Sequence, residues 1–230
     1  MKDMLTNSVF FGAMISLAAY EGGLLLKKKF KLAVLNPLLI GTICVMAVLT
    51  LLKIDYKSYN DGAKYISYLL TPATVCLALP LYRQFNLLKQ NLKAVMGGIL
   101  SGVLASLSSV FLLSKLFGLT HEQYVTLLPK SITTAIGLGI SEELGGITTI
   151  TVAVIIVTGI LGNVIAEFVC KIFRIEEPVA KGLALGTASH AIGTSKAMEM
   201  GEIEGAMSSL AIAVAGLITV FGASLFASLM

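Results

Sequence analysis

The chain has 230 residues, of which 56% are apolar and only 13% are charged, and its mean hydropathy is +0.89. A soluble protein of this size needs far more polar surface, so the composition indicates a polytopic, all-α membrane protein. A β-barrel is disfavoured, because its strands alternate apolar and polar residues and do not give long apolar runs. The net charge of +4 is not a nucleic-acid footprint, since the lysines and arginines gather in short loops. We expect a single integral membrane domain over residues 1–230.

Apolar runs long enough to span a bilayer recur along the chain. A spanning helix needs roughly 20 residues. The first run is not followed by a small-residue cleavage site, so we expect it to stay as the first helix. A shorter, more polar segment lies at about 125–145. The expected spanning segments are 6–26, 33–53, 62–81, 94–117, 146–170, 178–198 and 206–229.

The basic loops predict the topology, because cytoplasmic loops are enriched in lysine and arginine. This rule places loops 27–31, 82–93 and 171–181 on the cytoplasmic face, with 118–124 and 199–205 opposite. For loop 171–181 to be cytoplasmic, segment 125–145 must dip into the membrane and return to the same side. The prediction is therefore about seven transmembrane helices plus a re-entrant segment. The alternative is a full eighth crossing that reverses everything after it.

Two of the expected spans read as broken helices. Pro72 lies near the middle of 62–81, and proline removes a helix hydrogen bond. The stretch "LGTASHAIGTSK" surrounds His190 with glycines and hydroxyl residues. Each broken helix lies between two continuous ones, and the two sets of three start on opposite sides of the membrane. This order predicts inverted repeats whose broken helices cross near the midplane, as in secondary transporters. A kinked helix repaired by threonine hydroxyls is the alternative for 62–81.

The breaks predict a site for a small anion. A broken helix exposes backbone N–H groups at a positive dipole end, and neighbouring hydroxyls and cations add to the attraction. His190, with a pKa of about 6.5 in water, is expected near the midplane beside Thr71 and Pro72, where it gains a proton when the anion arrives. The alternatives are that His190 is a hydrogen-bonded interior residue, that Lys196 extends to the interface, and that Glu142 marks only the end of the dip. The expected substrate-binding residues are Thr71, Pro72, Thr74, Lys130, Ser131, Thr133, Thr134, Thr187, Ser189, His190, Gly193 and Thr194, with Glu142 and Lys196 as coupling or charged residues.

Enzyme signatures are missing from the sequence. It contains neither H-E-x-x-H nor G-x-S-x-G, and Asp3, Asp55 and Asp61 all lie near loops. The cysteines show no ligand spacing and are expected to be packing residues. We therefore expect no catalytic activity, no metal site and no cofactor.

Four stretches resemble the LrgB/CidB family of bacterial membrane proteins, and the resemblance covers nearly the whole chain. They are "LNPLL" at 35–39, "LLTPATVCLALPLYRQ" at 69–84, "LPKSITTAIGLGISEELGG" at 128–146 and "KGLALGTASHAIGTSKAMEMGEIEGAMSSLA" at 181–211. The last stretch is long and specific. The resemblance implies a multi-pass protein of the bacterial inner membrane.

The resemblance implies two classes of function. Family members are described as antiholin-like or holin-like regulators of murein hydrolase activity and autolysis, with a small LrgA/CidA-type membrane partner. A plastid relative resembles a glycolate/glycerate exporter, and some bacterial pairs are similar to pyruvate facilitators. We expect a transporter or facilitator of small monocarboxylates that works with an LrgA-type partner, with the regulator as the alternative. The expected partners are a small carboxylate, the LrgA/CidA-type protein and the lipid bilayer, with a homo-oligomer possible and no nucleic acid.

Overall fold

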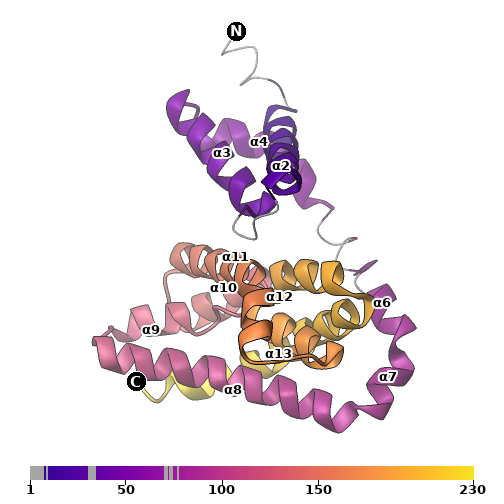
Figure 1. Cartoon of the computed structure of the whole chain (residues 1–230). Helices are drawn as coiled ribbons and strands as arrows, with labels where there is room; N and C mark the ends of the chain where they lie inside the picture. The colour runs from indigo at the N-terminus through magenta and orange to yellow at the C-terminus, as the bar shows by residue number, and fades with distance from the viewer. Residues whose placement is uncertain (1–7, 9, 31–34, 70–71, 73–74, 77) are drawn as a thin grey trace. The chain divides into compact units, whose positions relative to one another are not determined.

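The computed structural model describes residues 8, 10–30, 35–69, 72, 75–76 and 78–230, and every regular element in these ranges is a helix. The chain divides into two compact units, Met1–Cys76 and Leu77–Met230 (Figure 1). The expectation of a single integral membrane domain stays a prediction.

The first unit contains α2 (Phe11–Phe30), α3 (Pro37–Leu51) and α4 (Tyr56–Ser67). Asn36 caps α3, since its side-chain oxygen accepts a hydrogen bond of 2.8 Å from the Leu38 N–H, and proline occupies the first helical position. Gly12 lets α2 lie directly against the α4 backbone at Tyr59. This unit contains Pro72, which is exposed, whereas Thr71 and Thr74 lie outside the described residues.

The second unit contains the helices that are long and apolar enough to cross a membrane. Three described helices meet this condition, α8 (Leu92–Phe117), α11 (Thr148–Ile172) and α13 (Glu202–Ala227). They coincide with the expected spans 94–117, 146–170 and 206–229, which supports a membrane protein that is all-helical in its described residues. The other helices of the unit are α6 (Ala78–Arg83), α7 (Phe85–Gln90), α9 (His121–Leu127), α10 (Thr134–Glu143) and α12 (Pro178–Met200).

The chain between α8 and α11 leaves the α8 end and returns to it. A capping box of Thr120 and Gln123 starts α9. Further along, the Ile147 N–H donates to Thr126 Oγ1 at 2.8 Å, and Thr151 Oγ1 donates to the Thr126 carbonyl at 3.0 Å. Residues 126 and 147 therefore lie close together. We call residues 121–147 the first excursion; this path is the one expected for a re-entrant segment at 125–145.

Helix α12 is broken at His190, whose φ of 42° and ψ of −137° are not helical. Gly182 packs against Glu204, and Gly186 packs further along α13, against Ser208 and Ala211. Residues 178–189 therefore run parallel to α13.

The second half of α12 runs the opposite way along the same helix. Thr194 Oγ1 lies 2.7 Å from Ser208 Oγ, whereas Met198 contacts Gly205. Leu185 and Ala197, on either side of the break, pack together around Ala166 of α11. Helix α12 is thus a hairpin with its tip at His190, and we call it the second excursion.

This reversal corrects the expectation that 178–198 crosses the membrane and that 199–205 faces away from loop 171–181. Met200 shares one cavity with Lys171 and Lys181, and Glu202 lies 3.8 Å from Arg83 of another expected cytoplasmic loop. The physical reason is the backbone at His190, which turns the chain back where a milder kink would have let it continue.

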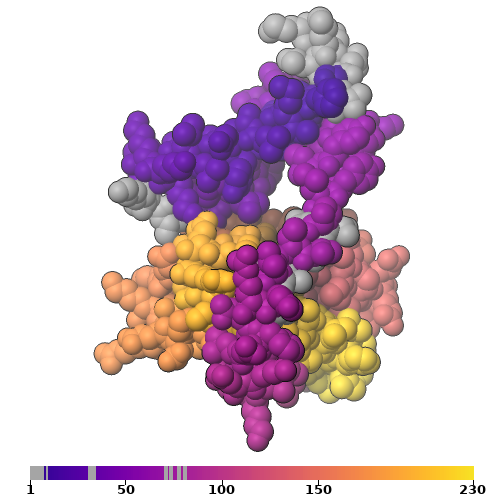
Figure 2. Space-filling view, turned by 90° about the vertical axis from the view of Figure 1, so that its right-hand side faces the viewer, coloured from indigo at the N-terminus to yellow at the C-terminus, as the bar shows by residue number. Residues whose placement is uncertain are grey.

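The two excursions start from opposite ends of α13 and meet inside the unit. The first begins where the Tyr124 hydroxyl donates to the Phe226 carbonyl, at the C-terminal end of α13, and the second begins and ends beside its N-terminal end. Figure 1 shows α8 and α11 on opposite sides of the unit, with α12 and α13 between them. Figure 2 shows α6 and α7 in magenta, and α6 packs on α13. Ser131 of the first excursion and Thr187 of the second line one small cavity together with Ser106 of α8.

Candidate functional site

A lysine lies near the tip of the first excursion, between α9 and α10. Lys130 is half-buried, and its Nζ donates hydrogen bonds to Ser131 Oγ at 3.0 Å and to Ser106 Oγ at 3.3 Å. Ser106 also donates to Ser131 Oγ at 3.1 Å, which closes a three-membered polar cluster. Ser106 comes from the middle of α8, so the cluster joins the excursion to a spanning helix.

The Lys130 ammonium has no acidic partner within the described part of the chain, where its polar contacts are these two hydroxyls. A half-buried cation without a carboxylate is costly in an apolar environment unless an anion or water accompanies it. The cluster is therefore suited to receive an anionic group.

A cavity of about 1100 Å³ extends from this cluster along the groove between α8 and the first half of α12. Its lining begins near Leu87 and Glu177 and reaches Ser109 on α8 and Ala188 on α12, so it leads from one end of the unit towards the two tips. Most lining side chains are small, which leaves room for a ligand. They include Ala94, Gly98, Ser101, Gly102, Ala105, Ser106, Ser109, Ala180, Ala184, Thr187 and Ala188.

Thr187 and Gly102 set the width of this groove. A Cβ on Gly102 would lie only 3.0 Å from Thr187 Oγ1, so the missing side chain lets the second excursion approach α8. Thr187 donates its hydroxyl proton to the Leu183 carbonyl at 2.7 Å. Its oxygen lone pairs therefore remain available, and its methyl group narrows the groove beside the polar cluster.

His190 does not line this cavity but packs against α11. Its Nε2 lies 2.9 Å from the Ile155 carbonyl oxygen, and because a carbonyl can only accept, Nε2 carries the proton. The ring fits because Gly159 has no side chain, since a Cβ there would come within 2.8 Å of it. The geometry matches the hydrogen-bonded interior alternative, and anion binding by His190 stays a prediction.

Three further predicted residues take part in packing the second excursion. Ser189 lies against Gly162 of α11, and Gly193 lies against the Leu185 carbonyl, which brings the two halves of α12 together. Thr194 Oγ1 bonds to Ser208 and also donates to the carbonyl of His190 itself at 3.0 Å. These contacts hold the hairpin closed.

The remaining predicted residues are spread more widely. Thr133 precedes α10, Thr134 begins it, and both are half-buried, whereas Glu142 is exposed near its end. The expected contact of His190 with Thr71 and Pro72 stays a prediction. Within the described ranges, no three His, Cys, Asp or Glu side chains group in a way that could hold a metal ion.

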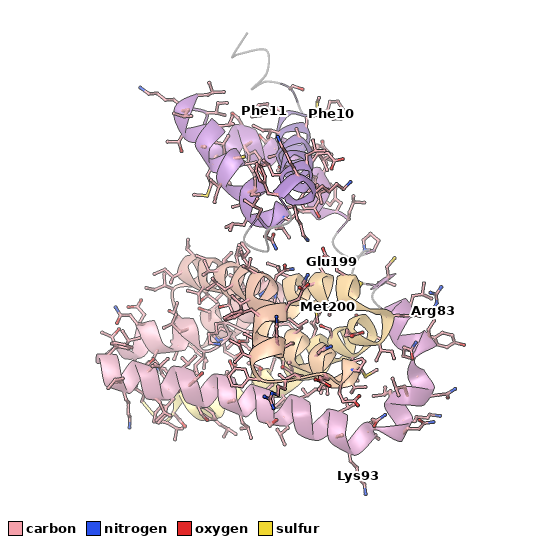
Figure 3. All side chains as sticks on the ribbon, viewed as in Figure 1. Phe10, Phe11, Arg83, Lys93, Glu199 and Met200 are labelled. Carbon is pink, nitrogen blue, oxygen red and sulfur yellow. The ribbon has the colours of Figure 1, made fainter. Side chains whose placement is uncertain are left out.

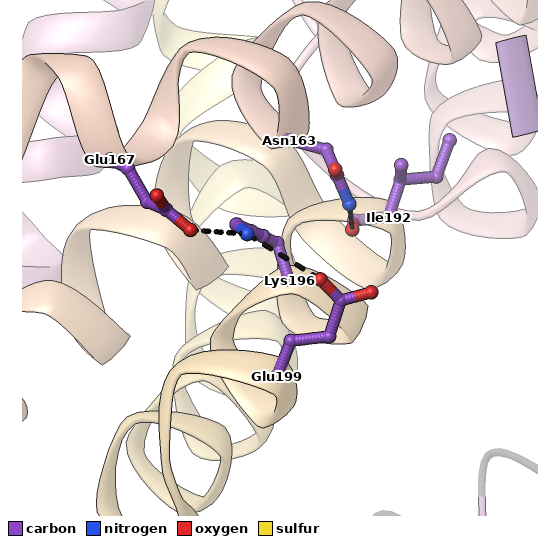
Figure 4. A network of polar contacts seen from close by, with 5 residues as sticks. All are labelled: Asn163, Glu167, Ile192, Lys196 and Glu199. Carbon is purple, nitrogen blue, oxygen red and sulfur yellow. Dashed lines mark hydrogen bonds and ion pairs between the residues drawn. The ribbon is translucent and has the colours of Figure 1, made fainter. Parts of the chain in front are cut away.

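Lys196 belongs to a charged network on the second half of α12 (Figure 4). Its Nζ lies 2.5 Å from Glu167 of α11 and 3.4 Å from Glu199. The Asn163 side-chain amide donates to the Ile192 carbonyl at 2.8 Å on the same face. The network fixes the returning half of α12 to α11, so Lys196 has carboxylate partners, whereas Lys130 has none among the described residues.

Sequence reasoning missed Ser106 and Gly102 as site residues. Small residues recur every fourth position in this part of α8, from Ala94 through Gly98 to Gly102. Nothing in the sequence connects this helix to the breaks. Recurrent small residues on one helix face are typical of close helix approach in membranes, and they were the available signal.

The LrgB-like family model matches residues 16–229. The chain belongs to the LrgB family. It is 39% identical over 216 residues to the antiholin-like protein LrgB of Bacillus cereus (strain B4264), and the alignment covers 94% of each chain. The same figures hold for the antiholin-like proteins LrgB of Bacillus cereus (strain AH187) and Bacillus anthracis (strain CDC 684 / NRRL 3495). No solved structure matches this LrgB-family protein.

Proposed function

We propose that this protein moves small monocarboxylates, of the pyruvate, glycolate or lactate type, across the bacterial inner membrane as a multi-pass carrier or facilitator without enzymatic chemistry. The observation that carries the proposal is the Lys130 cluster. A lysine ammonium bonded only to hydroxyls, within the described residues, lies in a cavity near the meeting point of two excursions. A carboxylate provides the missing negative charge and accepts charge-assisted hydrogen bonds.

The surroundings of Lys130 favour a small substrate with one negative charge. One ammonium and the hydroxyls of Ser106 and Ser131 suffice for one carboxylate. The groove beyond them is lined mainly by alanine, glycine and serine, which suits a short chain better than a sugar that needs many hydrogen-bonding partners.

The path of the chain supports an alternating-access mechanism. Helix α8 and the first excursion form one segment of the chain, and α11 and the second excursion form the next. The two segments are similar in length and run in opposite directions. We propose that they form an inverted repeat, 92–147 and 148–200, in place of the three-helix sets predicted from the sequence. Inverted repeats with irregular backbone at the substrate site are a recurrent design of secondary transporters.

Uptake of labelled pyruvate, glycolate and lactate into proteoliposomes tests this function, with and without a co-reconstituted LrgA-type partner. Lys130→Gln should raise the half-saturation concentration roughly tenfold or more, since a hydrogen bond to a charged group contributes about 1.5–3 kcal/mol. Lys130→Arg should retain part of the uptake. Lys93→Gln is the matched control, because Lys93 projects away from the unit (Figure 3). Absence of saturable flux for all three carboxylates in both preparations contradicts the proposal.

The second candidate function is the antiholin-like regulation that the names of the relatives give. It is favoured by 39% identity over 94% of the chain to proteins so named. We propose that it requires the LrgA/CidA-type partner and affects murein hydrolase activity. Autolysis of cells that express Lys130→Gln separates the candidates. If a variant without carboxylate flux still regulates autolysis as the unmodified protein does, the regulatory function does not depend on transport.

A further inference from the structure

A second cavity, of about 320 Å³, lies at the end of the unit where α11 stops and α12 begins. Three basic side chains line it, and each comes from a different place. Lys171 lies in the last turn of α11, Arg174 in the loop after it, and Lys181 in the first turns of α12. Glu167, Cys170, Ile175, Glu176 and Met200 complete the lining.

The positive charges in this cavity are largely uncompensated. Glu167 is engaged by Lys196. No ion pair joins Lys171, Arg174 or Lys181 to an acidic residue within the described ranges, which leaves Glu176 as the other carboxylate of the lining. Three cations against one unengaged carboxylate produce a local field that favours an anion.

The backbone at Arg174 holds this arrangement in an unusual conformation. Its φ is 51°, in the left-handed region where helices often end on glycine. The Ile175 N–H donates to the Cys170 carbonyl at 2.8 Å and the Arg174 N–H to the Lys171 carbonyl at 3.3 Å, which ends α11 and turns the loop. An arginine at this position is strained relative to glycine, so the side chain is not explained by the turn itself.

An exposed apolar stripe runs along α11 and ends at Ile172, at the same end of the helix as the basic cavity. Its residues recur at helical spacing on one face and consist of Leu161, Ile165, Phe168 and Ile172. Phe168 itself is 66% exposed. A cationic cavity at the end of a helix that exposes an apolar face matches an amphiphile with an anionic head and acyl chains.

We propose that this cavity binds the headgroup phosphate of an anionic phospholipid, with Lys171, Arg174 and Lys181 around the phosphate and the acyl chains along the α11 stripe. A free phosphate ion has the same headgroup chemistry but no chains to occupy the stripe. The site lies on the face that the basic loops assign to the cytoplasm, where anionic lipids attract such clusters. It is separate from Lys130, so its test does not depend on transport.

The test measures the melting temperature of the full-length protein in neutral detergent with added phosphatidylglycerol, phosphatidylcholine or sodium phosphate. Phosphatidylglycerol should raise the melting temperature, and Lys171→Gln with Lys181→Gln should remove most of this rise. Lys89→Gln with Lys93→Gln removes the same charge from exposed positions nearby and should keep it. If sodium phosphate raises the melting temperature as much as phosphatidylglycerol does, the ligand is not a lipid. If both double variants lose the same part of the rise, the cavity is not a specific site.

Arg174 allows a sharper version of the experiment. Arg174→Gly removes the charge and relieves the left-handed backbone, so the lipid-free melting temperature should stay level or rise while the response to phosphatidylglycerol falls. Arg174→Lys keeps a charge at the same backbone position and should keep most of the response. If Arg174→Gly responds to phosphatidylglycerol as fully as the unmodified protein, Arg174 is not part of a headgroup site.

Discussion

Thr194 Oγ1 of the returning half of α12 lies 2.7 Å from Ser208 Oγ of α13, and both side chains are fully buried. Since Gly182 of the outgoing half packs beside Glu204 of the same helix, both halves of α12 lie along the first turns of α13. The hydroxyl pair therefore holds a hairpin whose two ends emerge at the same end of the unit.

The first prediction concerns this topology. Single cysteines at Arg174 and Glu202, in a cysteine-free background, should be labelled from the same side of the membrane, and a cysteine at His121 from the other. The physical reason is that α12 turns back at His190, so no crossing separates 174 from 202. Impermeant maleimide labelling of intact cells and of inverted vesicles measures this. If positions 202 and 121 are labelled from the same side, α12 crosses the membrane and the hairpin is contradicted.

The second prediction concerns the stability of the hairpin. Thr194→Val keeps the shape of the side chain but leaves Ser208 without its buried partner, which should cost about 1–3 kcal/mol of unfolding free energy. Thermal unfolding in detergent measures the loss as a lower melting temperature. Ser195→Ala is the matched control, because Ser195 is exposed and its hydroxyl bonds within its own helix. Equal melting temperatures for the two variants would show that the hydroxyl pair does not hold the hairpin.

The third prediction separates two roles of His190, which bonds the Ile155 carbonyl and occupies a left-handed backbone position. His190→Ala loses the hydrogen bond and keeps the backbone strain, whereas His190→Gly loses the bond and relieves the strain. The glycine variant should therefore be the more stable of the two by roughly 1 kcal/mol. His190→Gln should retain part of the stability, because its amide can donate to the same carbonyl. Thermal unfolding decides the order, and an alanine variant more stable than the glycine variant contradicts it.

The sequence predicted the spanning helices of the second unit because an apolar run of about 20 residues is typical of a helix that crosses a membrane. It also predicted the position of the break at His190, since glycines and hydroxyls weaken a helix there. It could not predict the angle of the break. That angle depends on contacts far along the chain, such as Gly182 with Glu204 and Thr194 with Ser208. A broken span and a hairpin have the same local signature, so the side assigned to 199–205 was wrong.

The candidate site was predicted in part for a similar reason. Lys130, Ser131 and Thr187 stand out because polar residues are conspicuous between apolar runs. Ser106 does not, because α8 reads as one uninterrupted span with several serines, each of which can bond to its own backbone. Only the tertiary fold shows that this serine meets Lys130. The site is built from two excursions and a continuous helix. Sequence reasoning can therefore predict its residues on the excursions but not those on the helix.

The fourth prediction tests the groove itself through two glycines of α8. Gly102→Leu should fill the groove beside Thr187, whose Oγ1 lies 3.0 Å from the position of the added Cβ, and should lower carboxylate uptake roughly tenfold or more, which corresponds to about 1.4 kcal/mol or more in the barrier. Gly97→Leu makes the same change in the same helix where no atom lies within 4 Å, so its uptake should stay near the original. Both replacements favour the helix equally, because leucine is a better helix former than glycine. Proteoliposome uptake at matched protein content measures the difference. Equal uptake by the two variants excludes the groove between α8 and α12 as the substrate path, whereas a loss in Gly102→Leu alone, with an unchanged melting temperature, places the path beside Thr187.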